Sequence, residues 1–139
     1  MTLIDELLKA DRKKVDDLRH GIFKSQRLAD ILEVTEKVEV DIREIPARRI
    51  NDIASFQFDR KGNLDFSKTF DAKLMTCIEG IVNPDVRNKE LQEHFGCSTA
   101  KDLVEKLFGS EVGELSDEIS KISGIVENEE EDQEKEIKN

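Results

Sequence analysis

Two hydrophobic periods along the chain predict an α+β fold that is mainly α-helical. From Val38 to Ile42 apolar residues alternate with charged ones, which is the period of a half-buried strand. A lone strand is unstable, so we expect it to pair with residues 22–27 in a small antiparallel β-sheet near the N-terminal third. About five or six helices should make up the rest of the fold.

The strongest helical pattern predicts a central helix from Phe66 to Val82. Apolar residues recur there at spacings of three and four, with polar residues between them. Asn83 precedes Pro84, and a residue before proline disfavours the helical conformation, so the helix should end there. Six side chains would form its inward face: Phe66, Phe70, Leu74, Cys77, Ile78 and Ile81.

Residues that favour helix ends place the shorter helices. Thr2 and Thr99 each precede an acidic residue three positions on, which suits a helix N-terminus. Pro46 and Asn88 also suit helix starts, and Gly109 suits an end. We therefore expect helices at the start of the chain, after Pro46, before Gly96, between Thr99 and Gly109, and from Val112 to Ile122.

The first and last helices carry the candidate partner-binding residues. Each has a two-faced pattern and lies near one end of the chain. Their apolar faces would either pack inside the domain or contact a partner or a second copy, and the pattern leaves both open. The candidates are Leu3, Ile4, Leu7 and Leu8 in the first helix, and Val112, Leu115, Ile119 and Ile122 in the last.

The chain length of 139 residues suits one globular domain, which we place at residues 1–126. Residues 127–139 contain seven acidic residues and two lysines and no apolar period. Such composition predicts an acidic disordered tail. The tail would either solvate the protein or contact basic segments of a partner.

Charge argues against nucleic acid and membrane surfaces as partners. The formal net charge is −10, and nonspecific DNA binding requires Lys and Arg to neutralise phosphates. Residues 91–108 read as helix, break, helix, like a helix-turn-helix. The second helix, however, exposes Asp102 and Glu105 beside Lys101 and Lys106, and offers no Arg, Asn or Gln to read a base edge. No signal peptide and no apolar run of about 18 residues is present.

No motif for catalysis or cofactor binding emerges. His94 and Cys97 are close in sequence, but the chain has only two His and two Cys and no CxxC pair. The seven glycines form no phosphate-binding loop. We therefore predict a non-enzymatic protein without metal or cofactor, with Cys77 and Cys97 as free thiols in a reducing cytoplasm.

Five segments of the chain follow a recognisable pattern: "LIDELLKAD" (3–11), "REIPARRINDI" (43–53), "DRKGNL" (59–64), "EGIVNPDVRNKELQEHFGCSTAKDLVEKLF" (79–108) and "ELSDEISKISG" (114–124), followed by the acidic end. Together they resemble a known family, the XkdN-like tail assembly chaperones of long-tailed bacteriophages and phage-like elements. In one respect the chain differs: Gly109-Ser110 precedes Glu111 where the family pattern has Pro-Gly.

This resemblance implies a function that composition does not. Such chaperones bind the tape measure protein, a long aggregation-prone polypeptide, and keep it soluble while the tail tube polymerises around it. They act in the cytoplasm of the bacterial host and are absent from the mature virion. The tail tube protein and a second copy of the chain are further candidate partners. The alternatives are an oligomeric virion structural or scaffold protein and a helix-turn-helix DNA-binding regulator.

Overall fold

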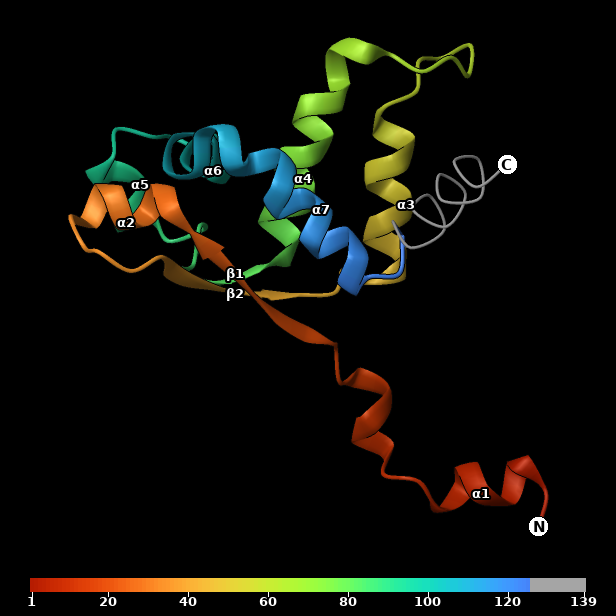
Figure 1. The fold of residues 1–139 in the computed structure, drawn as a ribbon. Coiled ribbons are helices and arrows are strands. Elements are labelled where there is room, and N and C mark those ends of the chain that lie inside the picture. Colours follow the sequence, from red (N-terminus) through yellow and green to blue (C-terminus); the bar gives the residue numbers. More distant parts are fainter. Residues whose placement is uncertain (126–139) are drawn as a thin grey trace, which may run out of the picture.

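A computed structural model describes residues 1–125, and the predicted acidic tail lies outside this range. The predicted class is confirmed: the fold is α+β, mainly helical, with a small antiparallel sheet (Figure 1). Within this range, 3₁₀ helices connect the elements: η1 (Arg12–Asp16), η2 (Phe66–Lys68) and η3 (Gly109–Glu111). The helices and strands are α1 (Leu3–Lys9), β1 (His20–Ser25), α2 (Gln26–Leu32), β2 (Val38–Arg43), α3 (Ala47–Phe56), α4 (Thr69–Gly80), β3 (Ile81–Asn83), α5 (Lys89–His94), α6 (Ala100–Phe108) and α7 (Val112–Ile122).

The sheet has the strand order β1-β2-β3, and both pairings are antiparallel. The predicted pairing of residues 38–43 with the Ile22 segment is confirmed, with Phe23 opposite Val40. The strand ends at Ser25, and residues 26–32 form helix α2 behind this N-cap residue. One face of the sheet is apolar and buried, because Phe23, Val40 and Ile42 point to the same side.

The predicted extent of the central helix is wrong at both ends. At its C-terminal end α4 stops at Gly80, and Ile81 pairs with Ile42 of β2 instead of continuing the helix. The helical spacing of Ile81 is therefore coincidental, since its backbone partner lies in a distant strand. At the N-terminal end Phe66 belongs to η2 and is 78% exposed, and Phe70 is 43% exposed. Neither lies on the buried face of α4, which consists of Ala72, Leu74, Thr76, Cys77 and Gly80.

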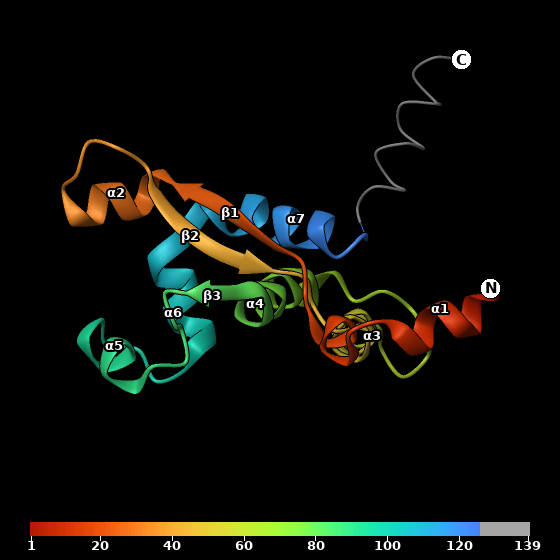
Figure 2. The same cartoon turned by 90° about the horizontal axis from the view of Figure 1, so that it is seen from below.

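Helix α4 is the centre of the core. It contacts α3, α6 and α7, and α7 also packs on β1 and β2 (Figures 1 and 2). Leu74 and Cys77 of α4 are fully buried in this layer. Gly80 lets α7 approach closely, because a Cβ there would lie only 2.5 Å from Cγ2 of Ile119.

Two charged side chains fix the corner between α2, α6 and α7. The Glu111 carboxylate accepts hydrogen bonds from Ser25 Oγ at 2.7 Å and from the backbone N–H groups of Gln26 and Arg27, at the start of α2. In the other direction the Arg27 guanidinium donates to the carbonyls of Lys106 and Leu107 at the end of α6. Each helix end therefore receives the charge that suits its dipole.

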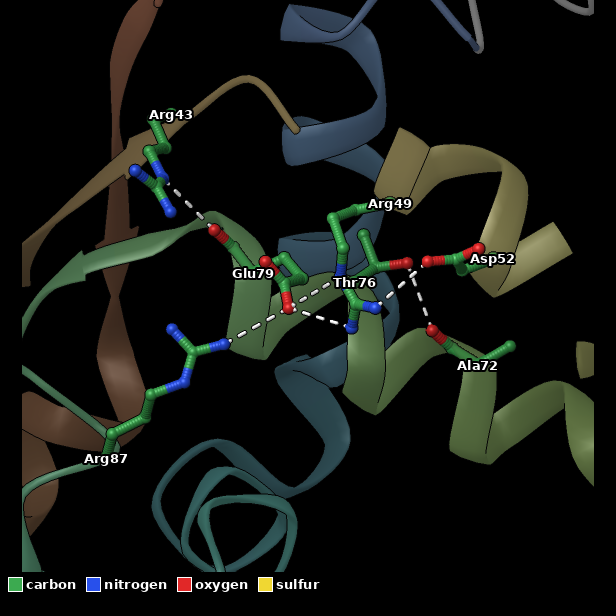
Figure 3. Close-up of polar contacts among 7 residues, drawn as sticks. All are labelled: Arg43, Arg49, Asp52, Ala72, Thr76, Glu79 and Arg87. Atoms are coloured by element: carbon green, nitrogen blue, oxygen red, sulfur yellow. Dashed lines mark hydrogen bonds and ion pairs between the residues drawn. The ribbon is translucent and has the colours of Figure 1, made fainter. Parts of the chain in front are cut away.

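A second polar cluster joins α3, α4 and the segment after β3. Its centre is Glu79, whose carboxylate lies 3.0 Å from Arg49 and 3.1 Å from Arg87 (Figure 3). Arg43 donates through Nε to the backbone carbonyl of Glu79. The pKa of Arg49 is raised, first by the charge of Glu79 and then by its hydrogen bond. The cluster is structural, because all three arginines contact Glu79 near the C-terminal end of α4. Arg49 also forms an ion pair with Asp52.

Candidate partner-binding surface

Helix α1 is closed at its start by a local capping box. Thr2 Oγ1 accepts a hydrogen bond from the Asp5 N–H at 3.2 Å, and the Asp5 carboxylate accepts one from the Thr2 N–H at 3.1 Å. The Asp5 carboxylate also accepts a hydrogen bond from Thr2 Oγ1. The bonds that this carboxylate accepts lower the pKa of Asp5, the one from the backbone N–H of Thr2 being the larger cause. The predicted cap is thus confirmed, and it orders the helix without any contact to the rest of the domain.

The apolar face of α1 is exposed along its whole length. The helix lies away from the helical body, beyond the start of β1 (Figure 1). No residue of α1 is buried. A helix of seven residues is normally stable in water only when it packs against other elements. Because none of its residues is buried, α1 lacks this support. The exposed fractions of its four apolar residues are 69% for Leu3, 69% for Ile4, 63% for Leu7 and 80% for Leu8.

A short segment joins α1 to the domain and is fixed at one point. Asp11 caps η1, and the chain then reaches Arg19, which meets Glu44 at the end of β2. The Glu44 carboxylate accepts from the backbone N–H of Arg19 at 2.9 Å and from its guanidinium at 3.3 Å. The hydrogen bond from the Arg19 backbone is the main reason that the pKa of Glu44 is lowered. We call residues 1–18 the N-terminal arm.

The last helix has the opposite environment. Val112, Leu115 and Ile119 are fully buried, and Ile122 is partly buried against the same core. Ile122 packs so near to Gly21 of β1 that a Cβ there would lie 2.6 Å from its Cδ1. These four candidates therefore hold α7 on the sheet and on α4, and a partner would reach Val112, Leu115 and Ile119 only if the domain opened.

Cys77 and Cys97 are free thiols. Burial raises the pKa of Cys77 to about 12, which keeps its thiol protonated. His94 stacks edge-on against Phe95 at 4.9 Å between ring centroids. Within residues 1–125 no three His, Cys, Asp or Glu side chains gather as metal ligands.

Helix α6, which would be the recognition helix of a helix-turn-helix, is packed into the core. Leu103, Val104, Leu107 and Phe108 are all buried. The helix contacts α4 on one side and α2 on another. The helix–break–helix at residues 91–108 is therefore a corner of the core. No helix among residues 1–125 is long and apolar enough to cross a membrane.

Sequence reasoning did not single out an apolar groove between α2 and α5. The groove measures about 260 Å³ and is lined by Leu28, Ile31, Leu32, Leu91 and Phe95, among others. The helical spacing of Leu28, Ile31 and Leu32 was the only signal, and it did not reveal that the last two would stay exposed.

The structure is a mainly helical α+β domain whose first helix leaves its apolar face exposed. The chain belongs to the phage XkdN-like tail assembly chaperone family, whose family model matches residues 4–138. This confirms the resemblance seen in the sequence. The role of the family is not enzymatic; it operates in the host cell during tail assembly and implies phage tail proteins as partners.

The fold is also similar to a solved structure, the crystal structure of the protein YqbN. The TM-score is 0.57 and the sequence identity 16%, over 78% of this chain and 87% of that chain. At this identity the likeness concerns the fold alone. None of the curated proteins matches the sequence.

Proposed function

We propose that this protein binds the tape measure protein of its phage and keeps it soluble during tail tube assembly. The observation that carries the proposal is the exposed apolar face of α1, in a chain that belongs to a tail assembly chaperone family. A long client whose helices have exposed apolar faces stays soluble only when those faces are covered. Helix α1 offers apolar surface for this outside the folded core.

The geometry of the N-terminal arm suits this task. Because the arm is fixed to the domain at Arg19 and Glu44, α1 can lie along a client helix while the acidic domain remains in water. A net charge of −10 keeps the coated client dispersed through like-charge repulsion. The binding surface and the solubilising surface are thus separate parts of one chain.

The expected affinity of one copy is modest. Burying one Leu or Ile side chain contributes roughly 1.5–3 kcal/mol, so the four side chains of α1 give roughly 6–12 kcal/mol. Association costs roughly 4–15 kcal/mol, which leaves a dissociation constant around micromolar or weaker. Many copies along one long client would add avidity, and weak single contacts permit release to the growing tube.

The test is coexpression of the tape measure protein with the chaperone or with the double variant Leu7→Asp/Leu8→Asp. The wild-type chain should move the client from the pellet to the supernatant. The variant should lose this effect, because removing two apolar contacts weakens binding at least about 100-fold. Both residues are exposed, so the stability of the variant should match the wild type within about 0.5 kcal/mol.

Lys9→Glu is the matched control, since it changes the net charge by the same −2 but leaves the apolar face of α1 intact. It should solubilise the client as well as the wild type does. A folded Leu7→Asp/Leu8→Asp variant that solubilises the client equally well would refute the role of α1. A client that is equally soluble without any chaperone would refute the proposed function itself.

We also propose that the protein leaves before the virion is complete. A chaperone that covers its client must vacate the surface on which tail tube subunits assemble. Mass spectrometry of purified tails should detect the tape measure protein and not this chain. A stoichiometric amount of the chain in finished tails would instead favour a virion structural role.

A further inference from the structure

Among residues 1–125, strand β1 is paired along one edge only, with β2. The Glu44 N–H donates to the Arg19 carbonyl at 2.8 Å, which fixes Arg19 as a hydrogen-bonded position facing β2. In an antiparallel ladder such positions alternate, so the N–H and C=O groups of His20, Ile22 and Lys24 point away from β2. No hydrogen bond to another part of residues 1–125 engages them. Figure 2 shows β1 at the outer margin of the sheet.

A groove of about 380 Å³ runs beside this edge, between β1 and α7. On the strand side it is lined by Ile22, Phe23 and Lys24. On the helix side it is lined by Lys121 and by three acidic side chains, Glu114, Asp117 and Glu118. Glu118 lies 3.7 Å from Lys121, whereas among the described residues Glu114 and Asp117 have no ion-pair partner.

The directions of the β1 side chains define what could fit in the groove. Phe23 is buried on the α7 side of the sheet, so Ile22 and Lys24 point to the opposite side. Ile22 remains 55% exposed. A strand added to the edge would therefore alternate in the same way. Its side chains on one side would meet Glu114 and Asp117 of α7, and those on the other would lie beside Ile22.

We propose that the β1 edge binds an extended segment of a partner protein as a fourth strand, with Lys or Arg side chains facing α7 and apolar side chains beside Ile22. The backbone groups of β1 would supply the affinity, and the acidic flank of α7 the preference for basic segments. The segment belongs to a protein other than this chain. Two copies paired edge to edge would bring the acidic flanks of two α7 helices together, and Lys24 on the edge opposes such pairing.

This site goes beyond the proposed function and uses no residue of the N-terminal arm. The experiment below therefore tests the β1 edge independently of the role of α1. It also gives the domain a second kind of contact: α1 covers apolar helices, whereas the β1 edge recognises extended basic chain.

The experiment measures amide hydrogen exchange by NMR in the full-length protein. The probe is an eight-residue peptide, blocked at both ends, in which Lys alternates with Val and Thr. At saturating peptide the amides of Ile22 and Lys24 should exchange at least about tenfold more slowly. A peptide of the same sequence with N-methylated amides along one edge should give no protection, since it cannot extend the ladder. Equal binding of the N-methylated peptide would overturn the proposal.

The double variant Glu114→Gln/Asp117→Asn tests the contribution of α7. Both side chains are exposed, so the variant should fold normally and bind the Lys peptide about five- to tenfold more weakly at low salt. The control is Glu90→Gln/Glu93→Gln on α5, which changes the net charge equally and should leave binding unchanged. Equal affinity in all three proteins would overturn the proposed recognition of basic segments.

A final measurement tests whether the β1 edge binds a second copy of the protein instead of a partner. If Ile22 and Lys24 become protected as the protein concentration rises without peptide, two copies share the edge, and the proposal is wrong. Exchange rates that are independent of protein concentration, together with peptide-dependent protection, support it.

Discussion

The contact between Gly80 and Ile119 decides whether α7 belongs to the core or to a partner surface. Ile119 was a candidate partner-binding residue, and the structure buries it fully against Gly80. A Cβ added at Gly80 would lie 2.5, 2.6 and 2.8 Å from three side-chain carbons of Ile119. We therefore predict that Gly80→Ala destabilises the protein, and that truncating Ile119 removes the penalty.

The magnitudes follow from the buried geometry. Ile119→Ala should cost about 2–5 kcal/mol of unfolding free energy, because it empties a fully buried site. Gly80→Ala should cost about 1–3 kcal/mol from overpacking, offset by up to about 1 kcal/mol of improved helix propensity. In the Ile119→Ala background the clashing atoms are gone, so Gly80→Ala should be neutral or slightly stabilising. The expected coupling is about 1–3 kcal/mol.

The assay is urea unfolding of the four proteins of this double-mutant cycle at one temperature, with the slope of each transition compared. Gly113→Ala is the matched control, since it lies in α7 and no atom comes within 4 Å of an added Cβ. It should be neutral or stabilise by up to about 1 kcal/mol.

Two results would refute the reasoning. If Gly80→Ala and Gly113→Ala have the same effect, the close approach of α7 to α4 is absent. If Ile119→Ala leaves the free energy of unfolding unchanged, Ile119 is not in the core, and the last helix is again a candidate partner-binding surface.

Two further predictions concern titratable groups. Because Cys77 is buried with a pKa raised to about 12, a thiol reagent should modify Cys97 in the native protein and Cys77 only after urea unfolding; rapid native modification of both thiols would contradict the burial. Glu44 has a pKa below its usual 4.5 because the Arg19 backbone donates to it, so its stabilising effect is present above that usual value and is lost as pH falls through the lowered pKa. NMR titration should show the protection factor of the Arg19 amide, its exchange relative to the intrinsic rate at each pH, falling in this acidic range, and Glu44→Gln should remove this pH dependence.

Local patterns in the sequence were sufficient for the elements whose signals are short-range. The alternation in residues 38–43 predicted β2, and Thr2, Asn88 and Thr99 predicted three helix starts that the structure confirms. Such features depend on neighbours within a few residues, because caps and side-chain periods are properties of one backbone segment. The family resemblance is also a property of the sequence, and the family match confirms it.

The sequence could not tell β3 from the end of α4. Ile81 fits the helical spacing of Leu74 and Cys77, and only the hydrogen bonds offered by β2 place it in a strand. The same limit applies to Phe66 and Phe70, whose spacing indicates a buried face although the structure leaves both side chains exposed.

The sequence by itself determined an acidic, mainly helical domain with two amphipathic terminal helices and no catalytic motif. Only the tertiary structure decided that the two helices differ: α7 is packed between the sheet and α4, whereas α1 lies beyond the start of β1 with its apolar face in solvent. The physical reason is that a hydrophobic period records which side chains avoid water and not which surface covers them. That surface is supplied by residues far away in the chain, and for α1 we propose that it is supplied by another protein.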